Sequence, residues 1–288
     1  MSQIKRIIFS DLDGTLLDHY TYQSIAASET LAQLKSADIP VILNTSKTYA
    51  ELETIIQDLQ LDTPFIIENG AAVYIPIGTF ASQPDDTKVV GKYWVKSFCL
   101  PVAHWLSLLS TEGKKFSGNF QGFSAMSESE LALLTGLSIE DAERAKQRQY
   151  GEPIQWLGDE ETKDVFINHM IDLGANVVQG GRFLHLGGYC DKGQAMLWLA
   201  EQYLEHYIAC SSAANQSHVV TPSLCTIALG DGENDTAMLE AADIAVQIKS
   251  PVHDFPSLHR QKMTTQTSLY GPEGWAEAIQ SLLVEQLT

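Results

Sequence analysis

The fold is decided by a short stretch near the start of the chain, Ile7-Ile8-Phe9-Ser10-Asp11-Leu12-Asp13-Gly14-Thr15, in which an apolar run leads into a turn with two carboxylates. The apolar run predicts a buried strand over residues 4–10, and Gly14 permits a tight turn directly after it. Ligands of open α/β sheets bind at the carboxyl ends of strands, so both carboxylates are expected where chemistry takes place. A turn can aim Asp11 and Asp13 differently, so that one attacks while the other serves as acid and base.

A second acidic turn, Gly230-Asp231-Gly232-Glu233-Asn234-Asp235, follows a predicted strand over residues 225–229 and opens a helix. Asp231 and Asp235 can supply the carboxylate oxygens that Mg²⁺ takes as ligands, although Asp235 can instead cap the helix. The matching position of the two acidic turns, each directly after a strand, favours a shared metal site.

Two further polar positions extend this pattern. Thr45-Ser46-Lys47 follows a predicted strand over residues 41–43, and a hydroxyl there can hydrogen-bond a phosphate oxygen. We favour Thr45 for this role, with Ser46 as the alternative. Lys192 stands at the start of a predicted helix, where the macrodipole disfavours a cation. An anionic partner, such as a carboxylate or a phosphate, is therefore predicted beside it.

The alternation of short apolar strands with amphipathic helices predicts an α/β protein with a parallel sheet covered on both faces. The middle third loses this rhythm. We expect a core domain from residues 1–84 and 188–288, with an α+β domain inserted at residues 85–187. Smaller predictions are a capping box of Thr48 with Glu51, strands at 92–96 and 165–167, and a loop from residue 207 to the strand at 225.

Composition excludes several classes of protein. The sequence has 18 Lys and Arg against 36 Asp and Glu, a net charge of −18, so binding to nucleic acid or to an anionic membrane is not expected. There is no apolar run of about 18 residues and no secretory signal, so a soluble cytoplasmic protein is expected. The four cysteines form no C-x-x-C pair, which gives no indication of a zinc ribbon or a redox motif.

In order and type, the four motifs resemble those of the haloacid dehalogenase superfamily of phosphatases. The resemblance implies a Rossmann-like core with an inserted α/β cap that determines substrate specificity. It implies that Asp11 is the nucleophile and forms an aspartyl-phosphate, and that Asp13 protonates the leaving group and later deprotonates water. Thr45 and Lys192 would then orient and neutralise the phosphoryl oxygens. The implied Mg²⁺ ligands are Asp11, the backbone carbonyl of Asp13, Asp231 and Asp235.

A narrower resemblance, to the mannosyl-3-phosphoglycerate phosphatases, rests on residues 65–76, 45–48, 144–153 and 180–186. It implies a small-molecule substrate with a phosphate, a glycerate carboxylate and a hexose, which would be mannose or glucose. Arg182 has the guanidinium that can bind such a carboxylate in a bidentate manner. The candidate substrate-binding residues are Thr45, Ser46, Glu68, Asn69, Arg144, Arg182, Lys192 and Asn234.

Other interpretations stay open. Arg182 can form a structural ion pair instead, and Arg144 can pair with nearby acidic residues. His185 can be a packed strand residue, and Glu152 a sugar ligand or a loop charge. At the level of function, the alternatives are another sugar phosphatase, such as one acting on sucrose phosphate, a hexose phosphomutase, or a catalytically silent sugar-phosphate sensor. The sequence does not predict the oligomeric state.

Overall fold

The computed structural model describes residues 4–180, 182–214 and 222–284, which fall into two compact units. The first contains residues 1–45, 59–96 and 191–288, and the second contains residues 46–58 and 97–190. By their packing, residues 85–96 thus join the first unit and residues 46–58 the second. The division expected from the sequence, at 84/85 and 187/188, stays a prediction.

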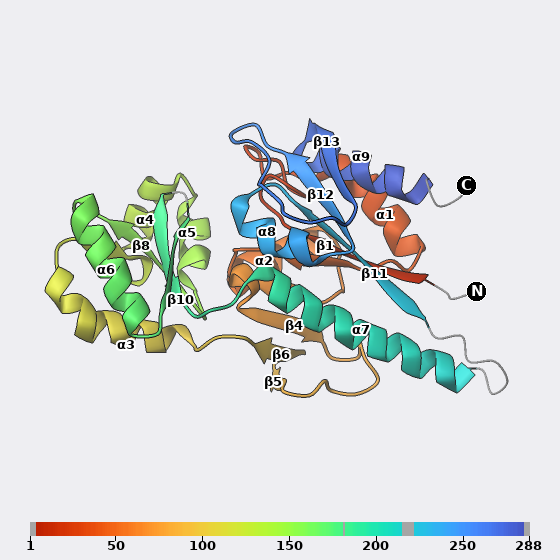
Figure 1. Cartoon of the computed structure of the whole chain (residues 1–288), viewed down its shortest axis with the longest axis horizontal. Helices are drawn as coiled ribbons and strands as arrows, with labels where there is room; N and C mark the ends of the chain where they lie inside the picture. Colours follow the sequence, from red (N-terminus) through yellow and green to blue (C-terminus); the bar gives the residue numbers. More distant parts are fainter. Residues whose placement is uncertain (1–3, 181, 215–221, 285–288) are drawn as a thin grey trace. The chain divides into compact units, whose positions relative to one another are not determined.

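The first unit is built on a sheet whose described strands run in the order β13-β12-β11-β1-β2-β3-β4-β6-β5 (Figure 1). The strands from β13 to β3 pair in parallel, whereas β3 with β4 and β5 with β6 pair antiparallel. The predicted α/β class and parallel core are therefore confirmed. The strands are β1 (Ile4–Ser10), β2 (Val41–Asn44), β3 (Phe65–Ile67), β4 (Ala72–Pro76), β5 (Lys88–Val90), β6 (Tyr93–Ser97), β11 (Ser223–Gly230), β12 (Ile244–Lys249) and β13 (Thr264–Tyr270).

The helices of the first unit form two groups. Helix α1 (Ser28–Ser36) packs against α9 (Gly271–Val284), and α7 (Lys192–Ala214) packs against α8 (Thr236–Ala241). Helix α1 connects β1 to β2, whereas α8 connects β11 to β12 in the opposite direction along the sheet. Because such crossovers are right-handed, the two helices cover opposite faces of the sheet. The short 3-10 turns of this unit are η1 (Ile25–Ala27), η2 (Glu68–Gly70) and η5 (Glu233–Asp235).

This topology determines where a ligand can bind. The chain leaves β1 toward β2 and leaves β11 toward β12, so the strand order reverses between β1 and β11. Open α/β sheets bind ligands at the carboxyl ends of the strands at such a switch point. The two acidic turns directly follow β1 and β11, and the fold therefore brings them to this position.

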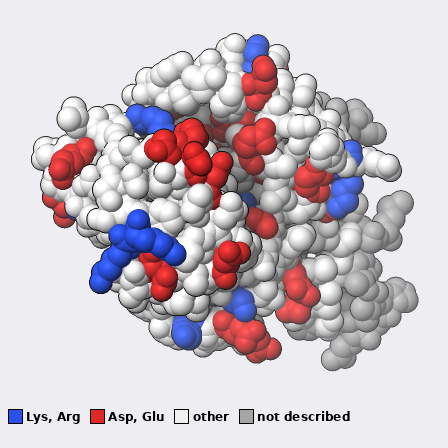
Figure 2. All heavy atoms as spheres, turned by 60° about the vertical axis from the view of Figure 1, so that its left-hand side comes forward, with Lys and Arg blue, Asp and Glu red and all other residues white. Residues whose placement is uncertain are grey.

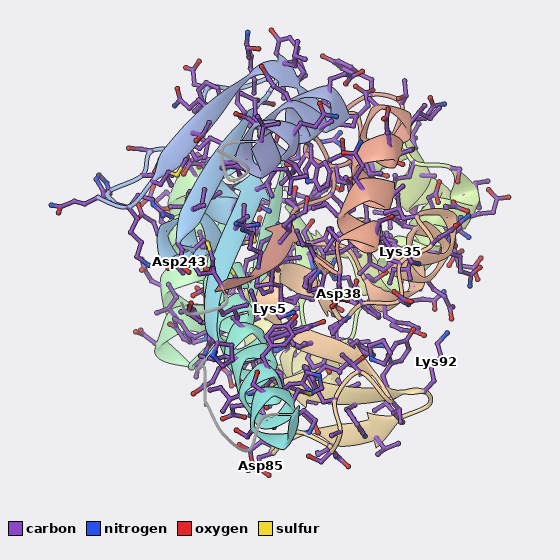
Figure 3. All side chains as sticks on the ribbon, turned by 90° about the vertical axis from the view of Figure 1, so that its right-hand side faces the viewer. Lys5, Lys35, Asp38, Asp85, Lys92 and Asp243 are labelled. Carbon is purple, nitrogen blue, oxygen red and sulfur yellow. The ribbon has the colours of Figure 1, made fainter. Side chains whose placement is uncertain are left out.

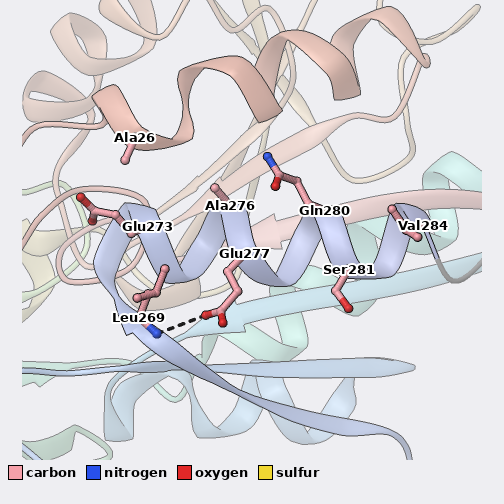
Figure 4. A pocket seen from close by; sticks show the side chains of 8 residues that line it. All are labelled: Ala26, Leu269, Glu273, Ala276, Glu277, Gln280, Ser281 and Val284. Carbon is pink, nitrogen blue, oxygen red and sulfur yellow. Dashed lines mark hydrogen bonds between the residues drawn. The ribbon is translucent and has the colours of Figure 1, made fainter.

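Helix α9 is attached to the sheet by buried and polar contacts. Trp275 is fully buried, and Glu277 accepts a hydrogen bond from the backbone N–H of Leu269 at 3.1 Å (Figure 4). Between β11 and β12, Asp243, labelled in Figure 3, accepts hydrogen bonds from the backbone N–H and Oγ1 of Thr226, both at 3.0 Å. The hollow beside α9 contains none of the predicted site residues; its lining is Ala26, Leu269, Glu273, Ala276, Glu277, Gln280, Ser281 and Val284.

The second unit has an antiparallel sheet in the order β7-β8-β10-β9. Trp105, Phe116, Phe166 and Met170 lie in its main apolar core. The strands are β7 (Phe120–Gly122), β8 (Glu152–Trp156), β9 (Asn176–Gly180) and β10 (Phe183–Gly187). The helices are α2 (Tyr49–Asp58), α3 (Val102–Thr111), α4 (Glu128–Thr135), α5 (Ile139–Lys146) and α6 (Glu160–Asp172), with 3-10 turns η3 (Glu112–Phe116) and η4 (Phe123–Ala125).

Two local predictions are wrong. Residues 165–167 lie in helix α6 rather than in a strand, because Phe166 and Met170 bury the same helix face and Asp159 caps the first turn by accepting from the backbone N–H of Thr162. Residues 207–214, expected in a loop, continue helix α7, while residues 215–221 lie outside the described part of the chain. The capping box of Thr48 with Glu51 and the strand near residues 92–96 are confirmed.

The acidic charge balance of the chain is visible on its surface. Asp and Glu side chains gather in several groups on the face shown in Figure 2, where Lys and Arg are fewer. An anionic ligand must therefore meet local positive charge in its binding site to overcome the overall field. None of the described helices has the length and the apolar run needed to cross a bilayer.

Candidate active site

Asp11 and Asp231 directly follow two adjacent parallel strands, β1 and β11. Ser10 at the end of β1 is in register with Leu229 of β11, and the backbone N–H of Asp11 donates to the carbonyl of Leu229 at 2.9 Å. Both carboxylates are buried, at 5 % and 6 % exposure. The pairing of β1 with β11 thus fixes the two predicted functional aspartates side by side.

Lys192 joins Asp11 to Asp235. Its Nζ lies 2.5 Å from Asp11 Oδ1 and 2.6 Å from Asp235 Oδ1, and its side chain is fully buried. Burial alone would lower the pKa of this amine, but the two carboxylates outweigh that effect and raise it, so Lys192 stays charged. The anionic partner predicted for Lys192 is therefore this pair of aspartates.

The carboxylates of the site have raised pKa values because they are buried together. Burial, followed by repulsion from Asp235, raises the pKa of Asp11 to about 7. Burial, followed by repulsion from Asp11, raises the pKa of Asp231 to about 6. Burial also raises the pKa of Asp235. A single lysine cannot balance three ionised carboxylates, so the site has excess negative charge when all three are ionised.

Asp235 organises the second acidic turn. Its Oδ2 accepts hydrogen bonds from the backbone N–H groups of Asp231 at 3.1 Å and Gly232 at 3.0 Å, while its Oδ1 accepts from Lys192. A Cβ on Gly230 would lie 2.5 Å from the Cβ of Asp235, so this position must be glycine. Both oxygens of Asp235 are therefore engaged within the protein, and its predicted role as a direct metal ligand stays a prediction.

The first acidic turn closes tightly over Asp231. The backbone N–H of Gly14 donates to the carbonyl of Leu17 at 2.9 Å, and Gly14 has a φ of 76°. A Cβ on Gly14 would lie 2.6 Å from Asp231 Oδ2. Thr15 Oγ1 donates to Asp231 Oδ1 at 3.2 Å. Half-buried Asp13 lies in this same turn, two residues from Asp11, and its role as acid and base stays a prediction.

Thr45 and Ser46, just after β2, belong to different units. Thr45 is 1 % exposed and belongs to the first unit, and its carbonyl accepts from the backbone N–H of Asn69 at 2.9 Å. Ser46 begins the segment that packs with the second unit, and its carbonyl accepts from Arg148 Nη1 at 3.1 Å. Thr45 thus shares the unit of the aspartate cluster, which favours it as the phosphate-binding hydroxyl.

The turn that contains Glu68 and Asn69 adopts left-handed backbone conformations, with φ values of 47° and 58°. Gly70 follows with a φ of 92°, and a Cβ there would lie 2.1 Å from the carbonyl oxygen of Asp191. This close approach holds the turn against the start of α7. Asn234 Nδ2 donates to Asn69 Oδ1 at 3.4 Å, so two predicted substrate-binding residues meet. Glu68 is buried in the same turn.

Two residues of this site were missed in the sequence. His253 Nε2 lies 3.3 Å from Asp231 Oδ2, in the segment after β12. Buried Asn44 donates through Nδ2 to the backbone carbonyl of Lys192 at 3.0 Å. Neither contact has a local sequence signal, because each joins segments that only the assembled sheet brings together.

The predicted arginines of the second unit have partners there. Arg144 Nη2 donates to Asp141 Oδ1 at 2.8 Å. Arg182 donates to the carbonyls of Leu134 at 2.9 Å and Thr135 at 3.1 Å, at the carboxyl end of α4. Such contacts satisfy the unpaired carbonyls of a helix end. Binding of substrate by these arginines stays a prediction.

His185 and Glu152 lie on the sheet of the second unit. Burial, followed by repulsion from Arg148, lowers the pKa of His185 to about 4, so its imidazole is neutral near pH 7. Glu152 is 2 % exposed and accepts from Ser124 through the backbone N–H at 2.9 Å and through Oγ at 2.6 Å. Glu152 is thus a buried carboxylate rather than a loop charge.

The aspartate cluster fits a small divalent cation. Asp11, Asp231 and Asp235 each offer an oxygen within 4.8 Å of the others. Oxygen ligands on opposite sides of Mg²⁺ lie about 4.2 Å apart, given bonds of about 2.1 Å. Within the described residues, Asp11 Oδ2 accepts no hydrogen bond. Hard carboxylate oxygens and excess negative charge are the donor chemistry that Mg²⁺ prefers.

Comparisons with known proteins agree with this arrangement. Residues 8–87 match the model of a haloacid dehalogenase-like hydrolase family. The chain is 36 % identical over 281 residues to a glucosyl-3-phosphoglycerate/mannosyl-3-phosphoglycerate phosphatase of Methanococcoides burtonii, covering 97 % of this chain and 98 % of the relative. A protein of the same name from Persephonella marina is 31 % identical over 283 residues, covering 97 % of each.

Solved structures show the same fold. A haloacid dehalogenase-like hydrolase from Bacteroides thetaiotaomicron superposes with a TM-score of 0.61 at 19 % identity, covering 96 % of this chain and 99 % of that one. The relatives at 36 % and 31 % identity span nearly the whole chain, both units included. The chain therefore belongs to the haloacid dehalogenase-like hydrolases and is a phosphoric monoester hydrolase of the family that includes these two relatives.

Proposed function

We propose that this enzyme is a Mg²⁺-dependent phosphatase that hydrolyses the phosphate ester of glucosyl-3-phosphoglycerate or mannosyl-3-phosphoglycerate through an aspartyl-phosphate on Asp11. The observation that carries the chemistry is the buried Lys192, bound to Asp11 at 2.5 Å and to Asp235 at 2.6 Å beside Asp231. The relatives that span the chain support the substrate class.

Asp11 has the features of a nucleophile. Its Oδ1 is held by Lys192, whereas its Oδ2 accepts no hydrogen bond from the described residues and is left to attack phosphorus. The attack forms the bond from Oδ2 to phosphorus as the bond from phosphorus to the C3 oxygen of the glycerate breaks. The positive charge of Lys192 stabilises the negative charge that develops on the phosphoryl group.

Asp13 is assigned the proton transfers. It would give its proton to the departing alkoxide and then take a proton from the water that hydrolyses the aspartyl-phosphate. Its place two residues after Asp11 in a closed turn supports this role. Thr45, buried in the same unit, would hydrogen-bond a phosphoryl oxygen.

Asp11 and Asp231, with the backbone carbonyl of Asp13, would hold Mg²⁺, and Asp235 would either bind the ion or act through Lys192 and the turn. When bound, the cation neutralises phosphoryl charge and orients the ester. Its binding also offsets the repulsion that raises the pKa values of Asp11 and Asp231.

Polar side chains are the candidates for recognising the rest of the substrate. Asn69 and Asn234, which meet at 3.4 Å, offer amide groups suited to sugar hydroxyls. The glycerate carboxylate requires a cation, and Arg144 and Arg182 are the candidates from the sequence. Each would exchange or share its present partners to bind the carboxylate.

The experiment that tests this function is phosphate release with Mg²⁺ from a matched substrate panel. The panel contains mannosyl-3-phosphoglycerate, glucosyl-3-phosphoglycerate, sucrose-6-phosphate, mannose-6-phosphate and para-nitrophenyl phosphate. We expect kcat/KM for a glycosyl-3-phosphoglycerate to exceed the others by at least ~100-fold, about 2.7 kcal/mol. A flat profile, or one led by sucrose-6-phosphate, would contradict the proposed substrate. Turnover that requires a bisphosphorylated activator would indicate a mutase.

A further inference from the structure

Two cysteines of the second unit face each other across a short distance. The Sγ atoms of Cys99 and Cys190 lie 3.3 Å apart, although 91 positions separate them in the sequence. Both side chains are half-buried. The bond length of a disulfide is about 2.05 Å, so an approach of about 1.2 Å would join them.

The backbone around Cys190 is shaped to fit Cys99. The backbone N–H of Cys190 donates to the carbonyl of Gly188 at 3.1 Å, which closes a tight turn. A Cβ on Gly188 would lie 2.4 Å from the Cβ of Cys99, so only glycine lets this turn pack so closely. Neither cysteine is fully buried, and Leu100 and Tyr189, their neighbours in sequence, are 50 % and 63 % exposed.

We propose that Cys99 and Cys190 form a reversible disulfide that acts as a redox-dependent modification site, with a low-molecular-weight disulfide such as oxidised glutathione as the oxidant. One cysteine thiolate attacks the oxidant, forming a mixed disulfide and releasing one glutathione thiolate. The second cysteine thiolate attacks the protein sulfur of the mixed disulfide and releases the other glutathione. The two cysteine protons end on the two glutathiones, and the two electrons reduce the oxidant.

The two cysteines lie close in sequence to points where the chain passes from one unit to the other. The chain passes between the two units at 96/97 and again at 190/191, next to both cysteines. The disulfide would therefore close almost all of residues 97–190 into one covalent loop. Lys192 follows Cys190 by two residues, and Asp191 Oδ1 caps the start of α7 by accepting from the backbone N–H of Gln194 at 2.8 Å.

A displacement of Cys190 would therefore be transmitted to the start of α7 and to Lys192. Misplacement of a group by about 1 Å near a reacting centre can cost up to about 100-fold in rate. We expect the oxidised enzyme to lose about tenfold in kcat, with recovery on reduction. This readout of turnover rests on the proposed function, whereas formation of the cross-link does not.

The test incubates the enzyme with oxidised glutathione, maps disulfide-linked peptides by mass spectrometry under non-reducing conditions, and measures kcat before and after reduction with dithiothreitol. We expect a Cys99–Cys190 peptide pair, the loss of two hydrogens from the intact mass, and a reversible loss of turnover. Cys99→Ser should form no cross-link and keep its turnover under oxidant, while the matched control Cys225→Ser should behave as the parent enzyme.

Each outcome decides one part of the proposal. Absence of the linked peptide pair, or the same loss of turnover in Cys99→Ser, would overturn the modification site. A complete cross-link with unchanged kcat would overturn its effect on catalysis. An enzyme inactive on every substrate when reduced would contradict the proposed function, and the peptide map would still decide the cross-link.

Discussion

Lys192 Nζ lies 2.5 Å from Asp11 Oδ1, and this contact joins the start of α7 to the end of β1. The two residues are 181 positions apart, and α7, which begins at Lys192, precedes β11, the strand that pairs with β1. Lys192 Nζ also donates a hydrogen bond to Asp235 Oδ1, at 2.6 Å. The same buried amine thus stabilises the acidic turns and provides the positive charge that a phosphoryl group requires.

Replacing Lys192 with methionine should strongly destabilise the protein above pH 7. The substitution leaves Asp11 and Asp235 buried without their cation, and breaking a buried ion pair in this way typically costs about 3–5 kcal/mol. Urea denaturation at pH 8 measures this loss, with Lys35→Met as the matched control, because Lys35 is exposed (Figure 3). A loss no larger than that of the control would contradict the role given to Lys192.

Asp231→Asn and Asp235→Asn should affect Mg²⁺ differently. Both oxygens of Asp235 accept hydrogen bonds, from Lys192 and from backbone N–H groups. The substitution Asp235→Asn should therefore lower the affinity for Mg²⁺ by about tenfold, as for a residue that positions the metal ligands. Asp231→Asn should lower the affinity for Mg²⁺ by at least ~100-fold, which is beyond the range of such indirect effects. Calorimetric titration of Mg²⁺ into each folded variant measures both values. Equal losses of Mg²⁺ affinity in the two variants would contradict this prediction and indicate that Asp235 is a direct ligand.

Mg²⁺ should stabilise the protein more at pH 8 than at pH 5. The pKa of Asp11 is raised to about 7 and that of Asp231 to about 6, both from 3.8. The folded state therefore binds more protons than the unfolded state between about pH 4 and 7, and stability without Mg²⁺ falls as the pH rises through this range. At pH 8 both carboxylates are ionised and ready to bind the cation.

The measurement is the shift in Tm on adding Mg²⁺ at the two pH values. Asp231→Asn serves as the control and should show a much smaller shift at pH 8. A shift that is equal at pH 5 and pH 8, or larger at pH 5, would show that ionisation of these carboxylates is not linked to metal binding.

The sequence predicted the core of this site because its signals are local. The apolar run before Asp11 specifies a buried strand, and the matching turn at Asp231 specifies a second, so the parallel sheet brings both to one edge. The requirement for an anion beside Lys192 also follows from its place at a helix start. These inferences need only the hydrophobic pattern and the rule for strand ends.

What could not be predicted depends on contacts between distant segments. The run Val165-Phe166-Ile167 is too short to distinguish a strand from a helix, and packing in the core of the second unit decides for α6. His253 reaches Asp231 from a segment without a motif. Binding of a carboxylate by Arg182 stays a prediction, whereas its hydrogen bond to the carbonyl of Leu134 in α4 could not be predicted, because it depends on the path of the chain between the two residues.

Arg182→Ala tests which role this guanidinium has. Because Arg182 caps α4 through the carbonyls of Leu134 and Thr135, its removal should lower the stability of the protein by about 1 kcal/mol. If Arg182 also binds the substrate, KM for the glycosyl-3-phosphoglycerate should rise far more than KM for para-nitrophenyl phosphate. Urea denaturation and kinetics on both substrates separate the two effects. Equal changes in KM would leave only the structural role.

The most direct test of the central claim is phosphate release by Asp11→Asn in the presence of Mg²⁺. The substitution removes the attacking oxygen while keeping the size of a buried side chain, and we expect kcat to fall by at least ~10⁴-fold, the scale of losing an essential nucleophile. Asp62→Asn, on an exposed side chain, is the matched control and should keep the parent activity. Circular dichroism should show both variants folded. Phosphate release by folded Asp11→Asn at a rate close to that of the parent enzyme would contradict the assignment of Asp11 as the nucleophile.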